Sequence, residues 1–141
     1  MGEASIVTAR RKARTVVLQA LYEVDCVGHP WDEVTERHLN SRRLSPGAVP
    51  FVRDLVKGVM ADTERIDGII ARFAPAWPVS QMAVIDRNLL RMAIYELVLE
   101  RTAPPKVVIN ETVELAKRFS SESSFRLVNG VLGSVLEMAG T

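Results

Sequence analysis

The chain has 141 residues, of which 48% are hydrophobic and 25% are charged, and its formal net charge is +1. This length suits one domain, and the composition is typical of a folded globular protein rather than a disordered one. The near-neutral charge excludes a uniformly basic, histone-like protein, so contact with nucleic acid would depend on local clusters of cations. We therefore expect a single domain over residues 1–141.

Other classes are also excluded by composition. Cys26 is the only cysteine, so the chain holds neither an intrachain disulfide nor a cysteine-rich metal site, as is typical of a reducing compartment. No apolar run approaches the roughly 20 residues of a membrane span. The basic N-terminus is not followed by the apolar stretch of a secretory signal. The sequence thus predicts a cytoplasmic protein that does not enter the membrane.

The first predicted helix has the clearest pattern. Apolar residues recur over 13–24 with helical spacing, and Thr8 is its expected N-cap. Clusters of proline, glycine and serine separate the later patterns, and no segment shows the sustained alternation of a strand. The later helices are expected over about 31–39, from near Pro50, from a cap at Asp62 or Thr63 through Phe73, over about 80–100, up to about Phe119, and around 128–139.

The segment 80–100 is apolar around most of its circumference, which indicates a helix in the middle of a bundle. Asn129-Gly130 usually signals a hairpin, but it lies inside an unbroken helical pattern, so we predict a helix there. Gly130 and Gly133 cost about 1 kcal/mol each in a helix, and their expected use is close approach of a neighbouring helix. The predicted fold class is all-α, with about seven helices.

Residues suited to catalysis are scarce. His29 and His38 lack metal-ligand spacing, and Cys26 is expected to be a small core residue. No nucleophile has a base that the sequence reveals, and no glycine-rich loop follows a strand. We therefore expect neither an enzyme, nor a metal site, nor a cofactor.

A basic cluster is formed by Arg10, Arg11, Lys12 and Arg14. In the first turns of the predicted helix, these cations would oppose the positive end of the helix dipole. A local rule that is broken without compensation indicates a function, here binding to nucleic-acid phosphates. A solubilising, frayed terminus explains the same pattern, and the residues alone leave both interpretations open.

A second basic group, Lys117, Arg118 and Arg126, brackets a serine-rich segment at 120–124, with Phe125 next to it. Hydroxyls, an aromatic face and cations suit single-stranded RNA, in which bases stack and phosphates pair. Alternatively, Phe125 is a core residue at the start of the last helix.

Several segments together resemble the NusB family of transcription antitermination factors. They occur in the family's order and extend from about Ala9 to Gly133, and only the ordered set is specific. The matching segments are 9–14 with 18–23, 51–59 with 66–67, 86–97, 105–111 with 113–117, and 128–133.

The resemblance implies an all-α fold of two antiparallel helical groups. It also implies binding to the boxA element of nascent RNA and a heterodimer with the small-subunit ribosomal protein that serves as NusE. This complex joins the assembly that keeps RNA polymerase elongating through ribosomal RNA operons. Whether the chain also forms a homodimer stays open.

The resemblance further implies site residues. Tyr22 and Asp86 match positions at the interface with the ribosomal protein. Leu127 replaces a common aromatic of the family and Ser123 an acidic residue, so either Phe125 has taken over the stacking or the contact is weaker. The RNA-binding positions implied by the family are Arg10, Arg11, Lys12, Arg14, Lys117, Arg118, Ser123, Phe125 and Leu127.

Two other functions are compatible with a helical chain of this kind. A NusB-like domain also precedes the catalytic domain of an RNA methyltransferase, but this chain has no glycine-rich cofactor loop after a strand. The other alternative is a structural helical protein, either monomeric or homodimeric, without an RNA role. Cofactor titration and an RNA-binding assay would separate these alternatives from the antitermination factor.

Overall fold

The structure, a computed structural model, describes the backbone of residues 3–140 and the side chains of residues 10–138. Within the described backbone the chain forms seven α-helices and no strand, which confirms the predicted all-α class. In chain order the elements are α1 (Glu3–Val27), α2 (Trp31–Asn40), α3 (Ala48–Ala61), α4 (Thr63–Phe73), the 3-10 turn η1 (Val79–Gln81), α5 (Val84–Ile94), the π-helix η2 (Tyr95–Glu100), α6 (Pro105–Phe119) and α7 (Glu122–Gly140).

The helices divide into two compact units, with the boundary between Met60 and Ala61. The first unit contains α1, α2 and α3, and the second contains α4 to α7 with η1 and η2. This division agrees with the two helical groups that the family resemblance implies.

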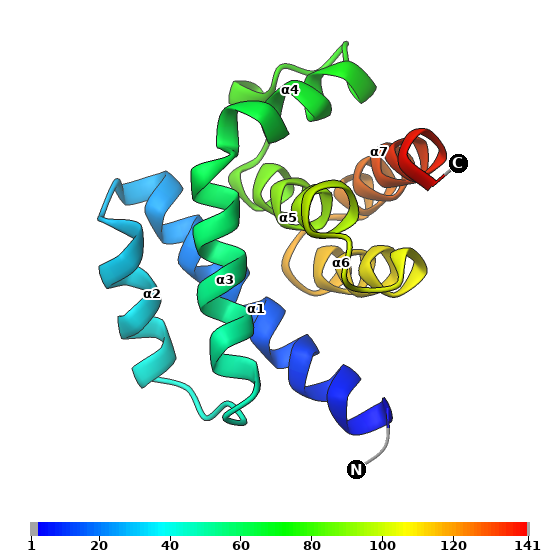
Figure 1. Cartoon of the computed structure of the whole chain (residues 1–141). Helices are drawn as coiled ribbons and strands as arrows, with labels where there is room; N and C mark the ends of the chain where they lie inside the picture. Colours follow the sequence, from blue (N-terminus) through cyan, green and yellow to red (C-terminus); the bar gives the residue numbers. More distant parts are fainter. Residues whose placement is uncertain (1–2, 141) are drawn as a thin grey trace. The chain divides into compact units, whose positions relative to one another are not determined.

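The first unit is a group of three helices (Figure 1). Helix α1 packs along α2, and the apolar positions of all three helices recur at intervals of three and four, so that each helix buries one stripe. Arg53 of α3 also donates to both carboxylate oxygens of Glu36 on α2, at 2.9 and 2.7 Å. The buried apolar residues of this unit include Ala13, Val17, Leu21, Val34, Val52, Leu55, Val56 and Val59.

Helix α1 begins earlier than the sequence pattern indicates. It is already helical at Glu3, so Thr8 lies inside the helix and the predicted N-cap is wrong. No proline or glycine separates Glu3 from Thr8, so nothing stops the helix from continuing upstream. Arg10 therefore lies about two turns into α1. Because the dipole effect is confined to the first turn, the dipole argument for the basic cluster does not hold.

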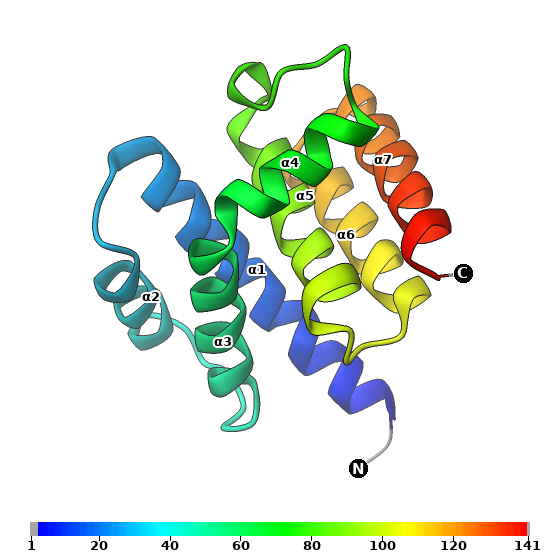
Figure 2. The ribbon, with the colours of Figure 1, turned by 45° about the horizontal axis from the view of Figure 1, so that its top comes forward.

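Helix α5 is the centre of the second unit. It packs against α4, α6 and α7, and none of its side chains is exposed. Figure 2 shows α5, α6 and α7 side by side with α4 crossing them. The prediction that this apolar segment lies inside a bundle is confirmed.

The segment around α5 is not one continuous helix as predicted. Met82 and Ala83 are extended between η1 and α5, with the Met82 side chain buried. At the other end the helix widens into η2, and Arg101 donates its backbone N–H to the Glu96 carbonyl at 2.9 Å, a bond that spans five residues. Arg101 then adopts a left-handed conformation, with φ of 59°, which ends the helix.

Helix α7 is continuous through Asn129-Gly130, which confirms the helix prediction over the hairpin signal. The expected close approach at Gly130 and Gly133 is wrong. Both glycines are exposed, and a Cβ atom added to either one would meet nothing within 4 Å.

We therefore expect Gly130→Ala and Gly133→Ala each to raise the free energy of unfolding by about 0.5–1 kcal/mol, because alanine has the higher helix propensity. Urea denaturation measures this change. Gly28→Ala is the contrasting control, since Gly28 has a φ of 79° and alanine there should destabilise the protein. A loss of stability in Gly130→Ala would contradict the open environment described above.

Candidate nucleic-acid interface

Burial divides the basic cluster of α1 into two kinds of cation. Arg11 and Lys12 are exposed, Arg10 is half-buried, and Arg14 is only 2% exposed. Arg10 and Arg14 are four residues apart and so share one face of the helix, whereas Arg11 and Lys12 point in other directions. The sequence pattern gave no reason to distinguish these four cations, but in the structure only three of them are accessible to a phosphate.

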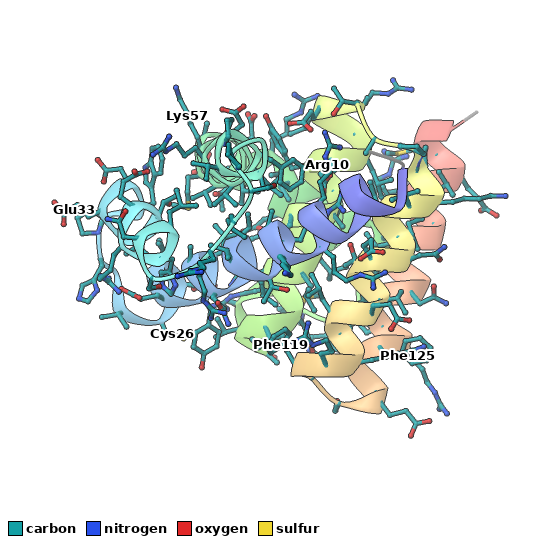
Figure 3. All side chains as sticks on the ribbon, turned by 90° about the horizontal axis from the view of Figure 1, so that it is seen from below. Arg10, Cys26, Glu33, Lys57, Phe119 and Phe125 are labelled. Carbon is teal, nitrogen blue, oxygen red and sulfur yellow. The ribbon has the colours of Figure 1, made fainter. Side chains whose placement is uncertain are left out.

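Both arginines of the shared face pack on Phe51 of α3. The guanidinium carbon of Arg10 lies 5.0 Å from the centre of the Phe51 ring, and that of Arg14 lies 5.2 Å away. These distances are typical of cation–π contacts. Phe51 lies in the helix expected from near Pro50 and was not among the expected site residues. Its part in positioning the basic cluster depends on the packing of α3 against α1, which no local sequence pattern reveals. Figure 3 shows Arg10 on the ribbon.

The C-terminal end of α1 carries the predicted partner residue Tyr22. Its side chain is 42% exposed, and Val27 nearby is 58% exposed. Cys26, one turn after Tyr22, is exposed as well, so its prediction as a core residue is wrong. A hydrogen bond between Cys26 and Tyr22 raises the pKa of the Tyr22 hydroxyl. Aromatic and apolar side chains therefore meet solvent at this end of the helix.

Next to Tyr22, the Glu23 carboxylate joins α1 to α2. It accepts hydrogen bonds from both terminal nitrogens of Arg37, one of them at 2.9 Å. His29 Nδ1 and His38 Nε2 each donate to a Glu23 oxygen at 3.0 Å. Arg37 first, and then the two histidines, hold the pKa of the Glu23 carboxyl well below its ordinary range. Both histidines thus take part in an ion-paired helix junction.

This junction predicts a pH dependence of stability. Because its pKa is depressed in the folded state, Glu23 stabilises the fold above its unfolded pKa of about 4.3 and loses that contribution as the pH falls further. We expect Glu23→Gln to lower the melting temperature at pH 7, with the difference from the wild type shrinking towards pH 3. Thermal melts between these pH values test this, with the exposed Glu33→Gln on α2 as control. A difference that does not change with pH would contradict the prediction.

In the second unit, the predicted RNA-binding residues gather where α6 ends and α7 begins, and Figure 3 shows Phe119 and Phe125 there. The exposed Lys117 places its ammonium 5.1 Å from the centre of the Phe125 ring. The exposed Arg118 lies 5.0 Å from the Phe119 ring. Phe125 is half-buried, as is Leu127. Phe125 is thus neither a core residue nor a fully exposed platform, and a cation lies over its ring.

The serine-rich segment forms an ordered cap for α7. Ser121 accepts the backbone N–H of Ser124 on its hydroxyl at 3.2 Å, as an N-cap residue does. The Ser121 hydroxyl also lies 2.9 Å from that of Ser123 and 3.0 Å from that of Ser124. Ser123 is exposed, whereas Ser124 is buried. One serine of this cap therefore faces solvent while its neighbour faces inward.

Asp86 at the start of α5 holds this segment from inside the unit. Its carboxylate is 6% exposed and accepts hydrogen bonds from the hydroxyls of Ser120 and Ser124, each at 2.8 Å. Its assignment to the partner interface stays a prediction, but both of its oxygens are engaged by the loop. Ser120 and Ser124 lie 34 and 38 residues from Asp86 in the chain, so the sequence contains no local signal for this contact.

The described part of the chain offers neither a metal site nor a membrane-spanning helix. Among residues 10–138 no group of three or more histidine, cysteine or acidic side chains is arranged to hold a metal ion. No helix in the described range is both long and apolar enough to cross a bilayer.

Comparisons with a family model and with known proteins all point to the same family. The family model described as "NusB family" matches residues 11–137. The transcription antitermination protein NusB of Dehalococcoides mccartyi strain CBDB1 is 49% identical over 128 residues, which cover 91% of this chain and 90% of that protein. The protein of the same name from Chloroflexus aggregans is 44% identical over 138 residues, covering 96% of this chain and 92% of that one.

Solved structures agree with this match. T. maritima NusB has a TM-score of 0.87 and 31% identity, covering 94% of this chain and 93% of its own. A chain from a crystal structure of the antitermination factors NusB and NusE in complex with dsRNA has a TM-score of 0.86 and 25% identity, covering 93% and 98%. The family match over residues 11–137, together with the identity and coverage of these relatives, shows that this chain belongs to the NusB family.

Proposed function

We propose that this protein is an RNA-binding transcription antitermination factor. It binds boxA-type single-stranded RNA together with the small-subunit ribosomal protein that serves as NusE, and it promotes read-through of ribosomal RNA operons by RNA polymerase. The observation that carries the proposal is the 49% identity, over nine-tenths of both chains, to a protein named for transcription antitermination. The role involves no catalytic step, and it would place the protein in the cytoplasm.

The contacts described above suit different parts of an RNA chain. Exposed Arg11 and Lys12, with half-buried Arg10, supply charge for phosphates, which carry no sequence information. Lys117, Phe125 and the exposed Ser123 combine a cation, an aromatic ring and a hydroxyl. Such a group can stack on and hydrogen-bond to a base only where the base is unpaired. The proposal therefore specifies single-stranded RNA, although the similar solved complex of NusB and NusE contains dsRNA.

The proposed partner surface is the C-terminal end of α1. Tyr22 and Val27 expose apolar area there. Aromatic side chains with a polar tip are enriched at protein interfaces. A folded ribosomal protein is thus a suitable occupant, and its binding would cover apolar surface that now faces water.

A fluorescence anisotropy titration tests the proposal. The ligands are a boxA-like single strand, a scrambled strand of the same composition and the boxA-like sequence as a duplex, each with and without the ribosomal protein. With the partner present, we expect the boxA-like strand to bind at least about tenfold tighter than the other two. Equal affinity for all three would reduce the function to general RNA binding, and absence of binding would overturn it. Light scattering on the same samples reports whether a homodimer forms.

A further inference from the structure

A continuous chain of hydrogen bonds runs from the surface of the α6–α7 loop to the buried Asp86. It starts at the exposed Ser123, passes through Ser121 and Ser124, and ends on the Asp86 carboxylate, with successive oxygens 2.9, 3.0 and 2.8 Å apart. Ser120 donates to the second oxygen of the same carboxylate at 2.8 Å. The solvent-facing serine is thus connected to a carboxylate that solvent barely reaches.

The chemistry of these groups sets the direction of the chain. A carboxylate only accepts hydrogen bonds, and each serine hydroxyl has a single proton to donate. Ser124 gives its proton to Asp86, so it accepts from Ser121. Ser121 has then used its own proton, and it accepts from Ser123. The proton of Ser123 therefore points into the loop, and the lone pairs of its oxygen face solvent.

We propose that Asp86 is a positioning residue for the RNA-binding loop, which fixes the direction of this chain and leaves Ser123 as a hydrogen-bond acceptor for an amino or imino group of an unpaired base. The inference rests on the proposed function and names which part of the RNA the loop reads.

If the Ser123 hydroxyl can only accept a hydrogen bond, it can bind a donor group of the RNA but not a phosphate oxygen. Phosphate oxygens carry no proton to donate at neutral pH, so they cannot bond to a hydroxyl oxygen whose proton is already used. Base edges and the ribose 2′-hydroxyl do carry donors, and of these only the donors of the base edges differ between RNA sequences. Disturbing the chain should therefore reduce the preference for the boxA-like strand and leave the affinity for scrambled RNA unchanged.

The test uses the full chain with its ribosomal partner and the substitution Asp86→Asn. An asparagine amide has one hydrogen-bond acceptor and one donor group. The Ser124 hydroxyl can then accept from the amide instead of donating to it, so the direction of the serine hydrogen bonds is no longer fixed. We expect the affinity for the boxA-like strand to fall about tenfold, the equivalent of one lost hydrogen bond, while the affinity for scrambled RNA changes less than about twofold. Binding of the ribosomal protein is measured in the same samples, so that both RNAs are compared with the partner bound.

The matched control is Asp67→Asn in the same unit. Asp67 is half-buried and accepts hydrogen bonds from Arg91 at 2.8 and 2.9 Å, so this substitution also removes a hydrogen-bonded carboxylate but leaves the loop intact. It should change the affinity for either RNA by less than about twofold. An equal loss in both variants would overturn the proposal.

A double-mutant cycle tests whether Asp86 acts through Ser123. Ser123→Ala removes the acceptor from an exposed position, and we expect the same tenfold loss as in Asp86→Asn, with no further loss when both changes are combined. Additive losses would overturn the proposal. If Asp86→Asn does not fold, Ser121→Ala takes its place in the cycle, because it interrupts the chain and retains the buried carboxylate with both of its donors.

Failure of the proposed function can be distinguished from failure of the positioning role of Asp86. If the wild type shows no preference for the boxA-like strand, that function fails, and the role of Asp86 is then read from amide hydrogen exchange without RNA. Asp86→Asn should speed exchange at Ser124 and Phe125, whereas Asp67→Asn should not. Unchanged exchange in Asp86→Asn would overturn the positioning role by itself.

Discussion

Replacing Arg11 and Lys12 together with alanine is expected to make the RNA affinity of this protein much less dependent on salt. Each cation that neutralises a phosphate of a single strand contributes about −0.7 to the slope of log affinity against log salt. Both side chains are exposed on α1. Losing two contacts should make the slope shallower by about 1.4, so a rise from 50 to 200 mM salt would weaken the variant about sevenfold less than the wild type. Anisotropy titrations at four salt concentrations measure this slope.

A control double variant separates the effect of the basic cluster from the effect of overall charge. Arg43→Ala with Lys57→Ala removes the same charge from exposed positions of the first unit outside the basic cluster, and Figure 3 shows Lys57 on α3. This pair should leave the slope near that of the wild type, because it removes net charge but no phosphate contact. If both double variants flatten the slope equally, overall charge governs binding and the assignment of the cluster fails.

Arg14→Ala is expected to act on stability instead. Its side chain is 2% exposed and lies against the Phe51 ring, so alanine removes the cation–π contact and the packing of a long buried side chain. We expect the free energy of unfolding to fall by about 1–3 kcal/mol, measured by urea denaturation. The salt slope of RNA binding by the folded variant should stay within error of the wild type.

Arg11→Ala is the comparison for this prediction, as an exposed arginine three residues earlier on the same helix. It should change stability by no more than about 0.5 kcal/mol. Arg14→Lys should restore only part of the loss, since an ammonium lacks the planar group that stacks on Phe51. A stable Arg14→Ala protein with a flattened salt slope would show that Arg14 reaches the phosphates despite its burial.

The sequence predicted the elements well where periodicity was strong. The helix over α2 and the end of α4 at Phe73 match the structure, because apolar spacing and adjacent breakers set them locally. The prediction failed at Thr8, where a plausible capping residue lies inside a helix without a local breaker. It failed again around α5, where burial of Met82 and the π-helical end at Arg101 interrupt one apolar pattern.

By itself, the sequence determined the all-α class, the position of the apolar stripes and the family, because each depends on residue types at fixed spacing along the chain. It also identified which charged residues are candidates for binding RNA. Only the tertiary structure decided which of those candidates are exposed and which are buried. Packing of α3 against α1 buries Arg14 on Phe51, and Asp86 reaches serines more than thirty residues away. Burial and hydrogen bonding between distant segments depend on how helices pack, and no local pattern in the sequence specifies them.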